Sequence, residues 1–105
     1  IVVLGHESCG AVDAALSGAA VPGHIGEVVK AITPNIAQAK DAPGNALDAA
    51  IRENVAAVVA KLRTAQPLLA PMVADGSLRG AALSGPGSRR GSSEAGGRLD
   101  CKLGR

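Results

Sequence analysis

Residues 1–12 read IVVLGHESCGAV, and this stretch decides the fold class of the chain. Residues 1–5 are apolar and end on Gly5, which is typical of a strand covered on both faces in a parallel sheet. A short polar turn follows, and the residues after Cys9 have the apolar spacing of a helix that Ser8 can cap. A buried strand that leads at once into a helix predicts an α/β fold.

The middle of the chain has the pattern of several helices joined by turns. Apolar side chains recur at helical spacing in four segments, 11–16, 25–32, 47–62 and 68–73. Gly18 is expected to end the first helix, and Asn45 is a plausible N-cap for the longest one. Residues 77–83 are expected to form a returning strand. This order of elements predicts a parallel-sheet core flanked by helices.

The composition excludes two classes of partner. The chain has 105 residues and no Phe, Tyr or Trp, so it has no aromatic rings to stack on bases. Six of the 11 Lys and Arg residues, but two of the nine Asp and Glu residues, lie from Arg79 onward. The net charge of +2 therefore belongs to the tail, and we expect no nucleic-acid binding. Because no apolar run approaches the about 20 residues of a membrane span, we expect no membrane partner.

The character of the sequence changes at residue 84. Residues 84–105 are rich in Gly, Ser and Arg and show no apolar period. Such a segment buries too little apolar surface to order itself. We therefore predict a partial domain at 1–83 and a disordered tail at 84–105, which includes Cys101. Since the chain begins inside an apparent core strand, we interpret it as lacking its N-terminal portion.

His6 and Cys9 are the candidate metal ligands. Imidazole and thiolate are donors that zinc prefers, and zinc takes about four donors, or three and a water. His6 follows a strand end, where α/β sheets place their sites. Cys9 is expected in the first turn of a helix, where the dipole and the free N–H groups favour thiolate over thiol. Without supporting flanks, the same spacing would fit a core histidine beside a small buried cysteine.

The flanking residues strengthen the metal interpretation. Residues 4–12, LGHESCGAV, resemble the second metal-binding motif of the β-class carbonic anhydrases. Stretches at 22–26 (PGHIG), 53–55 (ENV) and 67–78 resemble the same family in the same order. The resemblance covers roughly residues 1–79.

The resemblance implies a Zn²⁺-dependent lyase that hydrates CO₂ reversibly to bicarbonate and a proton. It implies that His6 and Cys9 bind the metal and that Ser8 and Gly10 lie near the site. The family's remaining Cys ligand and its Asp–Arg pair come from an upstream Cys-x-Asp-x-Arg motif outside this chain, and either water or that Asp takes the fourth position. We therefore expect no catalytic residue within the chain, weak zinc binding and no activity.

The resemblance also bears on assembly, location and the tail. Family members are dimers or larger, so we expect a homodimer or higher homo-oligomer. We expect it in the cytoplasm, with the periplasm left open.

The family continues after the returning strand with a Tyr-x-Leu-Asp-like stretch, whereas residues 83–91 read LSGPGSRRG. We interpret this departure as a frameshift near residues 79–83.

Two other functional classes stay open. The chain could belong to a non-catalytic homologue that serves as a structural or binding protein, which an upstream segment without Cys-x-Asp-x-Arg would indicate. It could instead be a thiol-based redox or metal-carrier module built on Cys9. That module would have a readily reacting thiol and a stability that does not depend on zinc.

Overall fold

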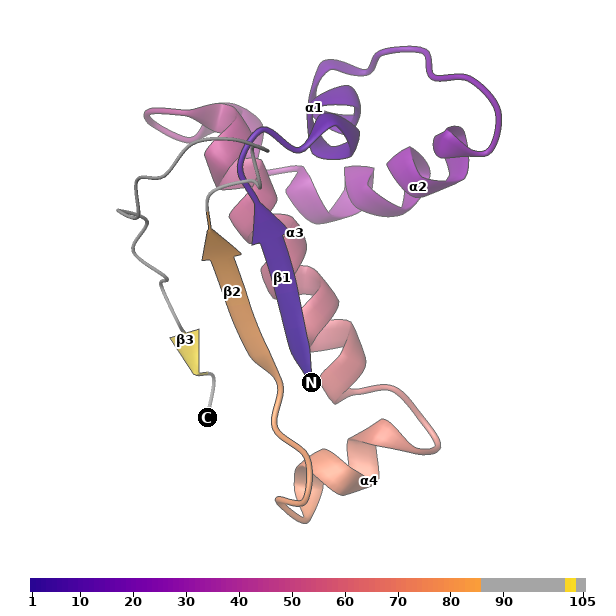
Figure 1. Ribbon diagram of the computed structural model, residues 1–105, viewed down its shortest axis with the longest axis vertical. Coiled ribbons are helices and arrows are strands. Elements are labelled where there is room, and N and C mark those ends of the chain that lie inside the picture. Colours follow the sequence, from indigo (N-terminus) through magenta and orange to yellow (C-terminus); the bar gives the residue numbers. More distant parts are fainter. Residues whose placement is uncertain (86–101, 104–105) are drawn as a thin grey trace, which may run out of the picture.

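The computed structural model describes residues 1–85 and 102–103. Its elements, in chain order, are β1 (Val2–His6), α1 (Gly10–Ser17), α2 (Ile25–Ile32), the 3-10 turns η1 (Thr33–Ile36) and η2 (Ala39–Asp41), α3 (Ala46–Arg63), α4 (Leu69–Ala74), β2 (Ala81–Gly85) and β3 (Lys102–Leu103). β1 and β2 lie side by side as parallel strands, with α3 packed against both (Figure 1). The predicted α/β fold with a parallel sheet and flanking helices is confirmed.

The returning strand differs in extent from its prediction. It runs from Ala81 to Gly85 rather than over 77–83. The reason is that Ser77 and Leu78 take part in the turn after α4, where the Leu78 N–H donates to the Met72 carbonyl at 2.9 Å. Only beyond this turn can the chain extend alongside β1.

The sheet includes part of the predicted tail. β2 lies between β1 and β3, and β3 pairs antiparallel to β2 with Leu103 opposite Ala81. The two residues of β3 and the last two of β2 are therefore strand, not disordered tail. The remaining residues of the tail, Cys101 among them, lie outside the described residues.

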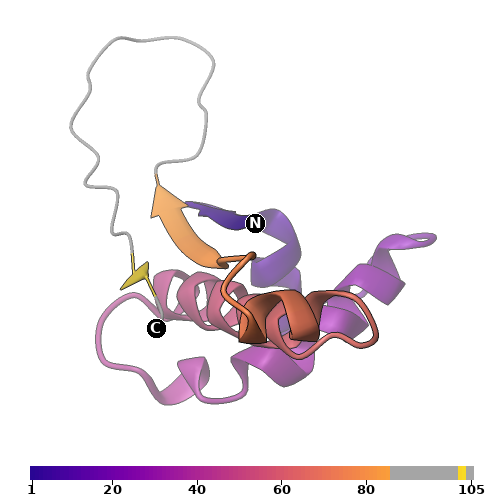
Figure 2. The same cartoon turned by 90° about the horizontal axis from the view of Figure 1, so that it is seen from below.

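Only one face of β1 is covered by the described residues. Gly5 is buried against α3, whereas the side chains of Val2 and Leu4 are 59% and 67% exposed. Figure 2 shows α3 on one side of the two strands. The prediction of a strand covered on both faces is wrong here, because an apolar run shows that a strand can be buried but not how many layers cover it.

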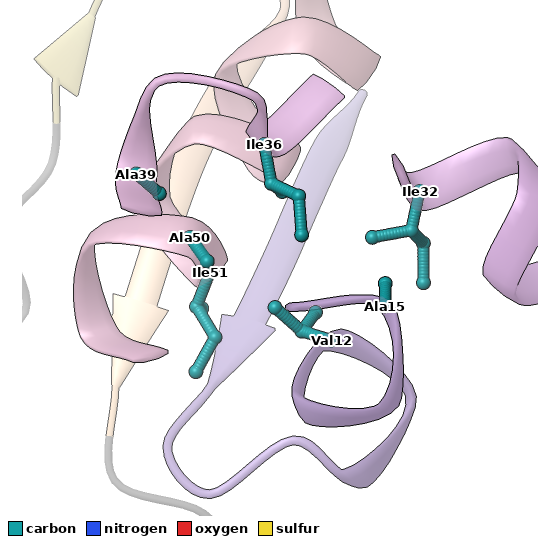
Figure 3. Close-up of a cluster of buried hydrophobic side chains, with 7 residues drawn as sticks. All are labelled: Val12, Ala15, Ile32, Ile36, Ala39, Ala50 and Ile51. Carbon is teal, nitrogen blue, oxygen red and sulfur yellow. The ribbon is translucent and has the colours of Figure 1, made fainter. Parts of the chain in front are cut away.

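The buried core lies among the helices and is built from small aliphatic side chains. Its cluster, in which the side chains point toward one another (Figure 3), comprises Val12, Ala15, Ile32, Ile36, Ala39, Ala50 and Ile51. Three of these are alanines and none is aromatic. The cluster anchors α1 against α2 and α3, and so fixes the start of α1 relative to β1.

Local signals set the helix ends as predicted. Gly18 ends α1 in a left-handed conformation with φ 70°. The Asn45 side chain accepts hydrogen bonds from the N–H groups of Leu47 and Asp48 and so caps α3. Pro34 lies in η1, directly after α2.

Candidate metal centre

The candidate ligands lie where β1 passes into α1. His6 is the last residue of β1 and pairs with Gly85 at the end of β2. The Glu7 N–H donates to the Gly85 carbonyl at 3.1 Å, which extends the pairing by one step. α1 then starts at Gly10. The three connecting residues thus lie at the carboxyl edge of two parallel strands (Figure 1), where α/β folds place their sites.

The ring of His6 is exposed, and one of its nitrogens has a defined partner. Nδ1 lies 3.0 Å from the backbone carbonyl oxygen of Glu7. A carbonyl oxygen can only accept, so Nδ1 carries the proton in this hydrogen bond. In a neutral imidazole, Nε2 then presents its lone pair, which is the form that binds a metal.

Cys9 is a free, half-buried cysteine at the N-cap of α1. Its carbonyl accepts the Asp13 N–H at 2.9 Å, and its side chain makes no capping hydrogen bond. Cys9 therefore lies just before the first turn of the helix rather than within it. The thiol is not engaged in capping and can serve as a ligand.

The two near-site candidates, Ser8 and Gly10, lie at the junction between β1 and α1. Ser8 does not cap α1, because Cys9 occupies the N-cap position. Instead, Ser8 has a left-handed backbone with φ 55°. Gly10 is the first residue of α1, and a Cβ placed on it would meet no atom within 4 Å apart from its chain neighbours and the backbone of its own helix. Close packing therefore does not explain the glycine at this position.

The other titratable side chains do not complete a site among residues 1–85. Within this range, no group of three or more His, Cys, Asp and Glu side chains could hold a metal ion. His24 is exposed at the N-cap of α2, as expected for a solvated residue, and Asp13 lies in the first turn of α1. Glu7 contacts the candidate ligand His6 through its backbone carbonyl.

Sequence reasoning missed two features of this junction. Neither the Glu7 carbonyl as the partner of His6 nor the left-handed Ser8 was expected. A backbone acceptor has no side-chain signature, and serine is not a residue type that indicates a positive φ as glycine or asparagine does.

None of the described helices has the length and apolar character needed to cross a membrane.

Comparison with known proteins assigns the chain to a family. The family model for carbonic anhydrase matches residues 1–83, a range that extends from β1 into β2 and includes both His6 and Cys9. A search of curated proteins found no match. Because the family model covers most of the chain, this protein belongs to the β-class carbonic anhydrase family.

Proposed function

We propose that this chain supplies two zinc ligands, His6 and Cys9, to a carbonic anhydrase that converts CO₂ and water reversibly to bicarbonate and a proton. The hydrogen bond from His6 Nδ1 to the Glu7 carbonyl, 3.0 Å long, carries the proposal. It leaves Nε2 available three residues before a free cysteine. The family match over residues 1–83 supports the choice of reaction.

The chemistry of the two donors fits zinc. An imidazole nitrogen and a thiolate sulfur are common zinc ligands, and a ligating histidine usually donates its other N–H to a carbonyl or carboxylate. His6 already has that second partner. Bound zinc would supply Lewis-acid activation of water. Ser8 and Gly10 flank Cys9 in the sequence and are proposed to lie near the site.

Two donors form an incomplete site. Catalytic zinc sites use about three protein donors and leave one position for water or substrate. Because residues 1–85 contain no group of three donors, the proposal requires a further donor from outside the described residues. For the 105-residue chain by itself, we therefore propose weak zinc binding and no CO₂ hydration.

Cadmium titration of the chain tests the ligand assignment. With Cys101→Ser as background, Cys9 is the single thiol, and the cadmium–thiolate ultraviolet band reports its coordination. We expect this band to appear in the background chain, to be absent from Cys9→Ser, which has no thiol left, and to require about tenfold or more cadmium in His6→Gln. His24→Gln, at the other histidine of the chain, is the matched control and should bind normally. Equal affinity in His6→Gln and His24→Gln would refute the assignment of His6, and absence of the band in the background chain would refute that of Cys9.

Two further measurements separate the alternative functions. Stopped-flow CO₂ hydration by the zinc-loaded chain should give no rate above buffer, and a measurable rate would overturn the expected inactivity. Thermal unfolding with and without zinc addresses the thiol-module alternative. If Cys9 reacts readily and zinc leaves the unfolding temperature unchanged, the redox or carrier interpretation replaces the zinc site.

A further inference from the structure

Ser8 has a backbone conformation that is unusual for its residue type. In the described part of the chain, it is the single non-glycine residue with a positive φ, 55°. It lies between the two candidate ligands, one residue before Cys9. We propose that Ser8 is a positioning residue, whose left-handed backbone turns the Glu7 carbonyl toward His6 Nδ1 and thereby keeps Nε2 free for a metal. The metal part of this inference rests on the proposed function.

The geometry of the peptide unit links Ser8 to His6. The Glu7 carbonyl belongs to the planar peptide between residues 7 and 8, and its direction depends on ψ of Glu7 and φ of Ser8. With φ at 55°, the oxygen of this peptide lies 3.0 Å from His6 Nδ1. With His6 and Cys9 held in place, φ of Ser8 can become negative only if ψ of Glu7 rotates in compensation, and this joint rotation would turn the carbonyl of the shared peptide away from the ring.

The flanking residues are in fact held. On one side, the Glu7 N–H donates to the Gly85 carbonyl at 3.1 Å, which ties the preceding peptide to β2. On the other side, the Cys9 carbonyl accepts the Asp13 N–H at 2.9 Å, which ties Cys9 to α1. Between these two anchors, Ser8 is the residue whose backbone takes the sharp change of direction.

The consequence for the metal site is control of the imidazole tautomer. A neutral imidazole has one protonated and one unprotonated nitrogen, and the partner of one nitrogen decides which form is present. The Glu7 carbonyl selects the form with the proton on Nδ1. A histidine held in this form before the metal arrives needs no proton shift when Nε2 binds.

Nitrogen NMR of the metal-free chain tests the inference without any activity assay. The chain has two histidines, His6 and His24, so long-range ¹H–¹⁵N spectra at alkaline pH give each tautomer without ambiguity. We expect His6 to carry its proton on Nδ1, and His24, exposed at the start of α2, to behave as an ordinary solvated histidine. A His6 ring protonated on Nε2 would overturn the proposal.

Three variants of Ser8 separate the backbone from the hydroxyl group. Ser8→Gly, Ser8→Ala and Ser8→Val all remove the hydroxyl, but tolerance of a positive φ falls from glycine to alanine to the β-branched valine. We expect the Gly and Ala variants to keep the Nδ1–H form and the cadmium affinity of the parent chain. The Val variant should shift toward Nε2–H and bind about tenfold more weakly. An equal loss in all three would overturn the proposal, because the hydroxyl would then be responsible.

The controls guard against two confounding results. Ser17→Val places the same side chain on the exposed end of α1 and should change neither tautomer nor affinity. If circular dichroism shows that Ser8→Val does not fold, the His6 tautomer and the cadmium affinity of the parent, Gly and Ala chains still test the proposal. If the parent chain has the proton on Nδ1 but does not bind cadmium, the proposed function alone is refuted. If it binds cadmium but has the proton on Nε2, the role of Ser8 alone is refuted.

Discussion

Gly5 of β1 lies so close to Val55 of α3 that a Cβ built on the glycine would be 2.7 Å from the Val55 Cγ2 atom. The same Cβ would lie 3.1 Å from Cγ2 of Ile51. Both side chains are buried in α3, so neither can swing away without disturbing its own packing. The strand that carries His6 therefore approaches the longest helix as closely as a glycine permits.

Substitution of this glycine should destabilise the fold. We expect Gly5→Ala to lower the free energy of unfolding by about 1–3 kcal/mol, because the added methyl group overpacks the contact with α3. Gly26→Ala is the matched control, since a Cβ at Gly26 of α2 meets no atom within 4 Å and alanine favours a helix. Urea unfolding measures the free energy of unfolding of both variants. The close packing would be disproved if the two variants had equal stability.

Two apolar residues of opposite exposure should differ sharply on truncation. Ile36 is 1% exposed and Leu4 is 67% exposed. We expect Ile36→Ala to cost about 3 kcal/mol of the free energy of unfolding, and Leu4→Ala to change it by less than about 0.5 kcal/mol. Chemical denaturation of both variants measures these free energies. A comparable loss in Leu4→Ala would mean that this face of β1 is covered in solution, and a dependence on protein concentration would identify the cover as another copy.

The turn after α4 should contribute a pH dependence to stability. Hydrogen bonds from the side chain and backbone of Ser77 hold the pKa of the Asp75 carboxyl below its ordinary value of 3.8, and the Ser77 N–H lies 2.8 Å from Asp75 Oδ1. Because the folded-state pKa is the lower one, the stabilisation is complete above the ordinary value. It is lost as the pH falls through the depressed pKa.

Two variants measure this effect. Carbon NMR titration of the Asp75 carboxyl should place its pKa below that of an unfolded reference, and Ser77→Ala should move it part of the way back, since the backbone N–H remains. Asp75→Asn should flatten the acid dependence of unfolding between about pH 2 and pH 5. An Asp75 that titrates at its ordinary value in the parent chain would contradict the prediction.

Zinc should protect Cys9 from chemical modification. In a Cys101→Ser background, where Cys9 is the single thiol, we expect excess zinc to slow alkylation by iodoacetamide by about tenfold or more, because a metal-bound thiolate is a poorer nucleophile than a free one. His6→Gln should abolish the protection, and His24→Gln should retain it. Mass spectrometry follows the rate. Protection that survives in His6→Gln would show that zinc binds Cys9 without His6.

Much of the fold could be read from local patterns in the chain. The end of α1 at Gly18 and the cap of α3 at Asn45 were both predicted, because a helix end depends on the few residues that satisfy its free N–H and C=O groups. The candidate ligands His6 and Cys9 could be picked out for the same reason, since both lie within one strand–turn–helix segment.

Tertiary contacts decided what the local patterns left open. The start of β2 at Ala81 depends on the turn after α4, and the exposure of Leu4 depends on which layers surround the sheet. At the site, the left-handed Ser8 arises because Glu7 is tied to β2 while Cys9 is tied to α1. The type and spacing of the donors are properties of neighbouring residues and were determined by the sequence alone. The direction of a single carbonyl was not, because one of its two anchors joins Glu7 to Gly85, and these residues, far apart in the chain, meet only in the folded protein.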